Sequence, residues 1–367
     1  MISGDRTVST YSETFREIRS PGRVAQVPRA SLTPGRGLLH GAGVIVPLAL
    51  GAATGQLAYG SFAALGALPT GFAAIFGHTA GRKSTATALL AAAGMAVASF
   101  VGALAAANPV FLLPVIALLA YVAGIVGAFS DRVAVAALQW PVSLLMATVL
   151  PETLGHAAIR AGFVLVGGLF QTALASTIAT PDGHRIIRTR PRNRRNRRTP
   201  QTFARHLVGT IRAHLGVSAV HGRHALRLAA TAVAAELAAR AVGLPHGYWA
   251  ALTAVVVLKS DHVLTVRRGL DRIGGTALGV VLGMVLAALA GVGTGPLLAG
   301  AAVVVILAYT VFGANYFLFS AFITGFVVLL LDLLGQSARD MAGARLAATL
   351  LGGAIALAAS HVRASDG

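Results

Sequence analysis

The sequence predicts an all-α, polytopic membrane protein, and its composition and charge distribution carry that prediction. The 367 residues are 56% hydrophobic and 11% charged, with a mean hydropathy of +0.74. Soluble domains carry about a quarter charged residues. A membrane-spanning helix needs about 20 apolar residues. Three stretches without Lys, Arg, Asp or Glu are each long enough for two or more such helices: residues 41–81, 84–130 and 273–331.

Glycine, proline and charged residues divide these stretches into about twelve expected transmembrane helices. In the first half we expect helices over residues 40–57, 60–77, 84–106, 109–129, 133–149 and 157–178. In the second half we expect them over residues 224–243, 247–258, 269–291, 294–312, 314–332 and 340–361. The resulting organisation is a flexible basic arm (1–38), a first six-helix repeat (39–178), a basic linker (179–222), a second six-helix repeat (223–362) and a short tail (363–367).

The two halves match as an internal repeat. The sequence GSFAAL at residue 60 corresponds to GYWAAL at residue 247, and HAAIRAGFVLVGG at residue 156 corresponds to DMAGARLAATLLGG at residue 340. The spacing between matched segments stays at 185 to 189 residues. An even number of helices in each half gives both halves the same orientation. We therefore predict two parallel repeats related by a pseudo-twofold axis along the membrane normal.

Basic residues predict the orientation of the chain. With both termini and the linker in the cytoplasm, 26 of the 30 Lys and Arg residues face inside. This asymmetry is the positive-inside pattern of a cell-membrane protein. The linker sequence RTRPRNRRNRRTP has no interleaved aromatic residues for stacking on bases, so we expect it to contact anionic lipid head groups and not nucleic acid.

The expected helix 247–258 is too short to cross the hydrocarbon core of a membrane. Its apolar residues span roughly 18 Å, against a hydrocarbon core of about 30 Å. The polar segment from Lys259 to Arg272 therefore begins within the membrane depth, where polar backbone is tolerated if it is buried in protein or lines water. Arg267 and Arg268 fit loop charges at the inner surface. Arg272 opens the next expected helix on the same face as Arg268, and guanidinium groups bind carboxylates in a bidentate manner.

Four further residues are candidates for a functional site. Arg160 and Arg345 recur about one turn inside an outer helix end in each half, where they either line a route or extend to the outer head groups. Trp249 either contacts substrate or belongs to the aromatic belt. Glu236, near the middle of its helix, either carries a coupling proton or pairs with an arginine such as Arg345.

The sequence contains none of the residue patterns that are typical of an enzyme active site. The chain has no cysteine, which excludes disulfides and thiolate catalysis. His221 and His224 have no accompanying carboxylate, and no Walker loop or Ser-His-Asp set is present. We therefore expect no catalytic residues, no metal site and no cofactor.

A stretch of about 60 residues resembles the fusaric acid resistance-like (FUSC) family of aromatic acid exporters. It is also similar to the plant aluminium-activated malate transporters. The residues that carry the resemblance are Arg227, Gly247-Tyr248-Trp249-Ala250, Leu252-Thr253, Val255-Val256-Val257, Arg268, Arg272, Gly275-Thr276 and Gly279. The resemblance implies proton-driven efflux of aromatic carboxylic acids or other small organic anions, with basic residues along a central route. The first half departs from the pattern, having Ser61-Phe62 and Arg82-Lys83 at the matching places.

Three functions remain open at this point. The first is a secondary exporter of organic anions, with aromatic carboxylic acids as the leading class and Arg268, Arg272, Arg345, Arg160 and Trp249 as the expected substrate contacts. The second is a passive organic-anion channel. The third is a membrane scaffold that transports nothing and presents the basic linker to a partner.

Overall fold

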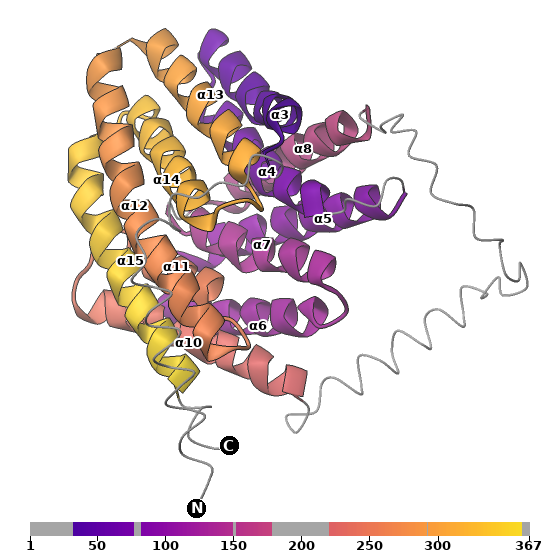
Figure 1. Ribbon diagram of the computed structural model, residues 1–367, viewed down its shortest axis with the longest axis vertical. Coiled ribbons are helices and arrows are strands. Elements are labelled where there is room, and N and C mark those ends of the chain that lie inside the picture. Colours follow the sequence, from indigo (N-terminus) through magenta and orange to yellow (C-terminus); the bar gives the residue numbers. More distant parts are fainter. Residues whose placement is uncertain (1–31, 77–81, 150–151, 178–219, 292, 362–367) are drawn as a thin grey trace, which may run out of the picture.

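The computed structural model describes residues 32–76, 82–149, 152–177, 220–291 and 293–361, and these residues form twelve helices (Figure 1). The first half contains α3 (Pro34–Ala53), α4 (Leu57–Phe76), α5 (Arg82–Ala105), α6 (Pro109–Gly127), α7 (Asp131–Ala147) and α8 (Leu154–Thr177). The second half contains α10 (Val220–Ala241), α11 (Tyr248–Val257), α12 (His262–Ala290), α13 (Thr294–Val311), α14 (Tyr316–Leu333) and α15 (Ala338–His361). Most of the expected arm and linker, and the tail, lie outside the described residues.

Nine of the described helices are long and apolar enough to cross a membrane. The helices α7 and α11 are apolar but shorter, and α10, with its embedded charges, is not among the nine. The described part of the chain therefore has the architecture of a multi-pass helical membrane protein. The count of twelve spans stays a prediction.

Side-chain caps fix where several helices begin. The Asn108 side chain accepts a hydrogen bond from the Val110 amide at the start of α6, and Asn315 accepts one from the Leu318 amide at the start of α14. A cap of this kind satisfies a backbone donor that the first helical turn leaves unpaired. Most expected boundaries agree with the structure to within a few residues, but α3 begins at Pro34 and not near residue 40.

The start of α12 corrects the sequence analysis. The helix begins at His262 instead of residue 269, because the Asp261 side chain accepts a hydrogen bond from the Leu264 amide. The Thr265 hydroxyl reinforces the first turn by donating to the Asp261 carbonyl at 2.8 Å. Arg267 and Arg268 therefore lie within a helix and not in a loop. The short preceding helix is confirmed, since α11 has 10 residues, which is about 15 Å.

The two halves of the chain interlock. Helix α13 packs against α3, and α10 packs against α6, although both pairs are far apart in sequence (Figure 1). One hydrophobic core combines α3, α4, α13 and α14, with Leu48, Phe72, Tyr309 and Phe326 among its buried residues. A second core combines α5, α6 and α7 with α10, α11 and α15. The two largest cores among the described residues therefore each combine helices from both halves.

Glycines bring helix backbones into close contact, which is the usual packing mode in membranes. On α12, Gly275, Gly279 and Gly283 face α14 so closely that an added Cβ would collide with α14 atoms. On α15, Gly352 lies against the Ala250 carbonyl of α11. On α8, Gly167 lies against the Ala63 carbonyl of α4. The three glycines of α12 therefore bring the polar faces of α12 and α14 into close contact.

Candidate anion-binding site

A polar seam runs between α12 and α14. The Arg268 guanidinium lies over the Tyr316 ring, with 3.7 Å from Cζ to the ring centroid. One turn further along both helices, Arg272 donates a long hydrogen bond of 3.5 Å to the Ser320 hydroxyl. The repeat of four residues on each helix keeps successive polar groups on the facing sides. The i, i+4 relation expected for Arg268 and Arg272 thus places both arginines on one seam.

The seam contains polar atoms that have no protein partner. Arg272 is 4% exposed, and its Nε atom has no hydrogen-bond partner among the described residues. The hydroxyls of Thr276 and Thr324, one turn beyond Arg272 and Ser320, are buried and equally unpaired. Buried polar groups are normally hydrogen-bonded, and each one left unpaired costs roughly 1–3 kcal/mol. A row of them on facing helices is therefore suited to a polar ligand.

A second buried arginine lies near this seam. Arg345 on α15 is 4% exposed, with its Cζ atom 4.6 Å above the centroid of the Trp249 ring on α11. Its positive charge is close enough to that of Arg272 for the two to repel one another. The Nε and Nη1 atoms of Arg345 and the indole Nε1 of Trp249 have no protein hydrogen-bond partner within the described part of the chain.

Neither Arg272 nor Arg345 forms an ion pair with a carboxylate that the structure describes. An isolated buried charge is costly unless a counter-charge compensates it. Two such charges that repel one another raise that cost further. The arrangement can therefore bind an anion, with charge-assisted donors from both guanidinium groups and an aromatic ring alongside.

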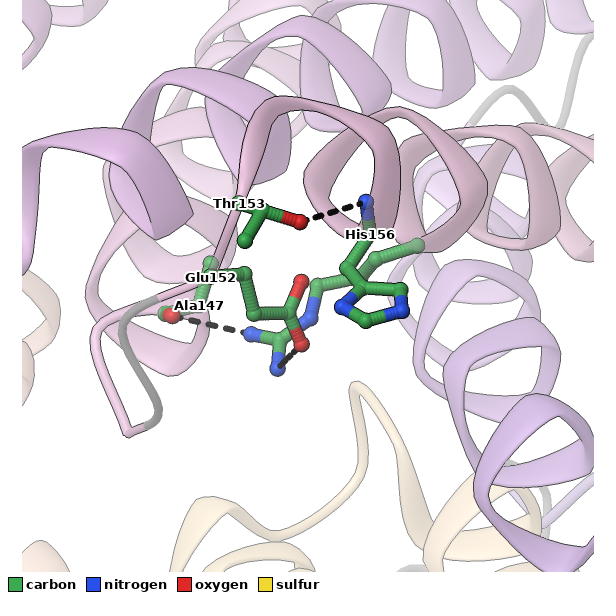
Figure 2. Close-up of polar contacts among 5 residues, drawn as sticks. Ala147, Glu152, Thr153 and His156 are labelled. Atoms are coloured by element: carbon green, nitrogen blue, oxygen red, sulfur yellow. Dashed lines mark hydrogen bonds and ion pairs between the residues drawn. The ribbon is translucent and has the colours of Figure 1, made fainter.

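Arg160 in the first half has a different environment. Its Nη2 atom lies 2.5 Å from the Glu152 carboxylate, and its Nη1 donates to the Ala147 carbonyl at 2.8 Å. Figure 2 shows Glu152 and Ala147 converging on one guanidinium group at the junction of α7 and α8. The Phe62 ring lies 4.6 Å from Cζ. Among the described residues, Arg160 is thus the one of the five predicted substrate contacts that forms an ion pair with an acid.

Glu236 on α10 pairs with the arginine one turn later. Its Oε1 accepts a hydrogen bond of 2.8 Å from Arg240 Nε, while the arginine side chain is 41% exposed. The expected pairing of Glu236 with an arginine is therefore present, but the partner is Arg240 and not Arg345. Spacing i, i+4 on one helix brings Arg240 within reach, whereas Arg345 is held over Trp249. The second carboxylate oxygen of Glu236 is buried without a protein partner in the described residues.

The break between α11 and α12 is held by hydrogen bonds to Lys259. Its amide donates to the Thr265 hydroxyl at 3.0 Å, and its carbonyl accepts from Arg227 Nη2 at 2.8 Å. Burial and, to a smaller extent, the charge of Arg268 together lower the pKa of the Lys259 ammonium to about 8. A third cationic side chain therefore stands at the entrance to the seam.

Several polar residues of this region were not predicted from the sequence. Ser320, Thr324 and Tyr316 recur every four residues on α14, and Thr276 continues the spacing of Arg268 and Arg272 on α12. If the four-residue spacing on α14 had been aligned with the same spacing on α12, the polar seam between the two helices would have been indicated. Glu152 was missed because the segment before α8 reads as an ordinary outer loop.

A separate buried polar group lies between α3, α8 and α13. Gln171 Nε2 is 2.7 Å from His40 Nδ1, and the Tyr309 hydroxyl donates to the Leu68 carbonyl at 2.7 Å. The Gln171 side-chain oxygen has no hydrogen-bond partner among the described residues. We place this group outside the candidate site because its donors and acceptors largely satisfy one another.

Comparison with known proteins adds family information for the second half. Residues 228–359 match the family model described as fusaric acid resistance protein-like. A stretch of 73 residues is 38% identical to the uncharacterized protein ORF2 of Neisseria gonorrhoeae, covering 20% of this chain and 18% of that protein. No solved structure matches the chain. The family match spans α11, α12, α13 and α14 entirely and most of α10 and α15, and so includes every residue of the polar seam.

Proposed function

We propose that this chain, whose residues 228–359 belong to the FUSC family, is an integral membrane exporter of organic anions, with aromatic carboxylic acids as the leading class. The family match and the apolar helices make it a transporter-like membrane protein. The observation that carries the substrate class is the buried pair Arg272 and Arg345 beside Trp249, which no described carboxylate neutralises. The ring gives an aromatic acid a stacking surface next to the charge.

The proposed architecture is two parallel six-helix repeats around an axis along the membrane normal. Helix contacts support it, because they recur in corresponding pairs. As α5 packs on α7 and α8 in the first half, so α12 packs on α14 and α15 in the second. The contact of α3 with α13 has its counterpart in that of α10 with α6. A route between the repeats is where transporters of this plan bind substrate.

The proposed location is the cell membrane, with both termini and the linker 179–222 in the cytoplasm. The distribution of Lys and Arg supports this orientation. In it, the break at Lys259 faces the cytoplasm, and the seam leads from there toward Arg345. The basic linker would then contact anionic lipids of the inner leaflet.

The proposed driving force is the proton gradient, with Glu236 as the coupling carboxylate. Its burial and its unpaired second oxygen support a group that can take up a proton in the membrane. The partner Arg240 is partly exposed, so the pair can be broken without leaving an arginine buried.

Reconstitution into liposomes tests the function. A panel of labelled aromatic and aliphatic acids is offered with and without a pH gradient. An exporter gives saturable flux of aromatic acids that rises with the gradient. Current without a gradient would identify a passive anion channel instead, and the absence of both flux and current would identify a scaffold.

A further inference from the structure

An arginine lies over an aromatic ring at corresponding places in the two halves, Arg160 in the first and Arg345 in the second. The Cζ–centroid distance is 4.6 Å for Arg160 over Phe62 and 4.6 Å for Arg345 over Trp249. In both halves the helix that carries the arginine packs through a glycine on the carbonyl of the residue that follows the ring. The two guanidinium groups therefore occupy corresponding positions.

The two positions differ in what neutralises the charge. In the first half, the Glu152 carboxylate closes on Arg160 from the segment before α8. The residue at the corresponding place before Arg345 is Ser337, which is exposed and carries no charge. Both Nε and Nη1 of Arg345 are left without a protein partner among the described residues.

We propose that Glu152 is a tethered ligand, and that its carboxylate shows where the carboxylate of a diffusible acid binds in the second half. Arg345 then binds the carboxylate of the ligand in the way that Arg160 binds the carboxylate of Glu152. The chain thus has one site open to a carboxylic acid and one site permanently closed by its own side chain. This inference rests on the proposed function in that the second-half site receives an organic anion.

The geometry explains why a carboxylate suits both positions better than a simple halide. Arg160 donates from separate nitrogens to one Glu152 carboxylate oxygen and to the Ala147 carbonyl, so that planar acceptors surround a planar donor (Figure 2). In the second half, the unpaired Trp249 indole N–H and the charge of Arg272 add a donor and a cation that the first half lacks. A free acid can therefore be held there without a covalent tether.

Chemical rescue by acetate tests the tether. The substitution Glu152→Ala removes a group equivalent to one acetate ion and leaves the Arg160 guanidinium buried without its acid. We expect a lower unfolding temperature for purified protein in detergent, restored by acetate but not by chloride at equal ionic strength. The double variant Glu152→Ala/Arg160→Ala should show no acetate-specific recovery. If Glu152→Ala does not fold, Glu152→Ser, which also vacates the position of the carboxylate, is measured in its place.

Benzoate tests the open position. We expect benzoate to raise the unfolding temperature of the unmodified protein, with half-saturation shifted at least tenfold by Arg345→Ala and unchanged by Asp340→Asn, the acid nearest in sequence. Equal rescue of Glu152→Ala and the double variant, or a benzoate effect that ignores Arg345, contradicts the inference even if liposomes export aromatic acids. Export that fails while both rescue patterns hold contradicts the proposed function and leaves the carboxylate positions standing.

Discussion

Arg160 and Arg345 lie over Phe62 and Trp249 at the same distance, yet Arg160 has the Glu152 carboxylate beside it and Arg345 has no carboxylate partner among the described residues. In the first half the positive charge of Arg160 is therefore neutralised by Glu152. The second half carries two buried guanidinium groups that repel one another. A buried pair that has lost one partner is typically destabilised by about 3–5 kcal/mol. The comparison shows that the second half retains an unfavourable arrangement which an anionic ligand would relieve.

Substitution of Glu236 in the second half and of Glu152 in the first distinguishes a role in proton coupling from a structural role. We expect the largest effect on transport from Glu236. Glu236→Gln should abolish gradient-driven export and leave substrate exchange intact, because the amide cannot carry a proton. Export and exchange are measured in the same liposomes. The matched control is Glu152→Gln, whose acid pairs with Arg160 and should leave the dependence on the gradient unchanged. Failure of Glu236→Gln to accumulate in the membrane would favour a structural role for its pair with Arg240.

The arginines of the two halves should respond differently to truncation. Arg272→Ala should weaken substrate affinity roughly ten- to hundred-fold, since a charge-assisted contact contributes about 1.5–3 kcal/mol. Arg272→Lys should weaken it less, because the charge remains but the planar fork is lost. Arg160→Ala should instead lower stability with little change in affinity. Affinity is measured on protein shown to be inserted normally. Equal effects of the two alanine variants would remove the distinction between the halves.

The contact between α12 and α14 should be sensitive to one methyl group. Gly279→Ala places a Cβ against the Ala321 carbonyl, so the two helices must separate and the polar seam must open. Overpacking of this kind costs about 1–3 kcal/mol. The control Gly343→Ala on α15 meets no atom within 4 Å and should be neutral. Unfolding temperature and transport rate are both measured, and a tolerated Gly279→Ala would mean that the seam is not set by this contact.

Lys259 gives the smallest expected effect, which depends on pH. Its folded pKa of about 8 lies below the usual value of 10.5. Between these values the unfolded chain binds more protons, so stability should increase as pH rises from 8 to 10.5. Lys259→Gln should flatten this rise in thermal unfolding curves, and an unchanged pH profile would show that the ammonium is not desolvated.

Much of the fold could be predicted from the sequence because each apolar stretch is long and bounded by charges or glycine. The start of α12 could not, since Leu264 and Thr265 read as a loop until the Asp261 cap is seen. The candidate site was found in part. Arg272 and Arg345 stood out as charges in apolar helices, but their proximity depends on how α12 and α15 pack.

The residues that were missed have a physical reason. Ser320, Thr276 and Thr324 are small polar residues, which membrane helices tolerate for packing as often as for binding. Their significance comes from the facing helix, which periodicity within one helix does not reveal. The partner of Glu236 was assigned across helices although Arg240 lies one turn away, because the pattern alone does not show which arginines are held elsewhere.

Trp249 allows the most direct test of the claim that the second half binds a carboxylate. The chain has two tryptophans, so Trp140→Phe leaves Trp249 as the single indole fluorophore, directly under Arg345. Titrating this protein with benzoate should change the fluorescence saturably, and adding Arg345→Ala should raise the half-saturating concentration at least tenfold. A titration curve that is the same with and without Arg345 would contradict the account.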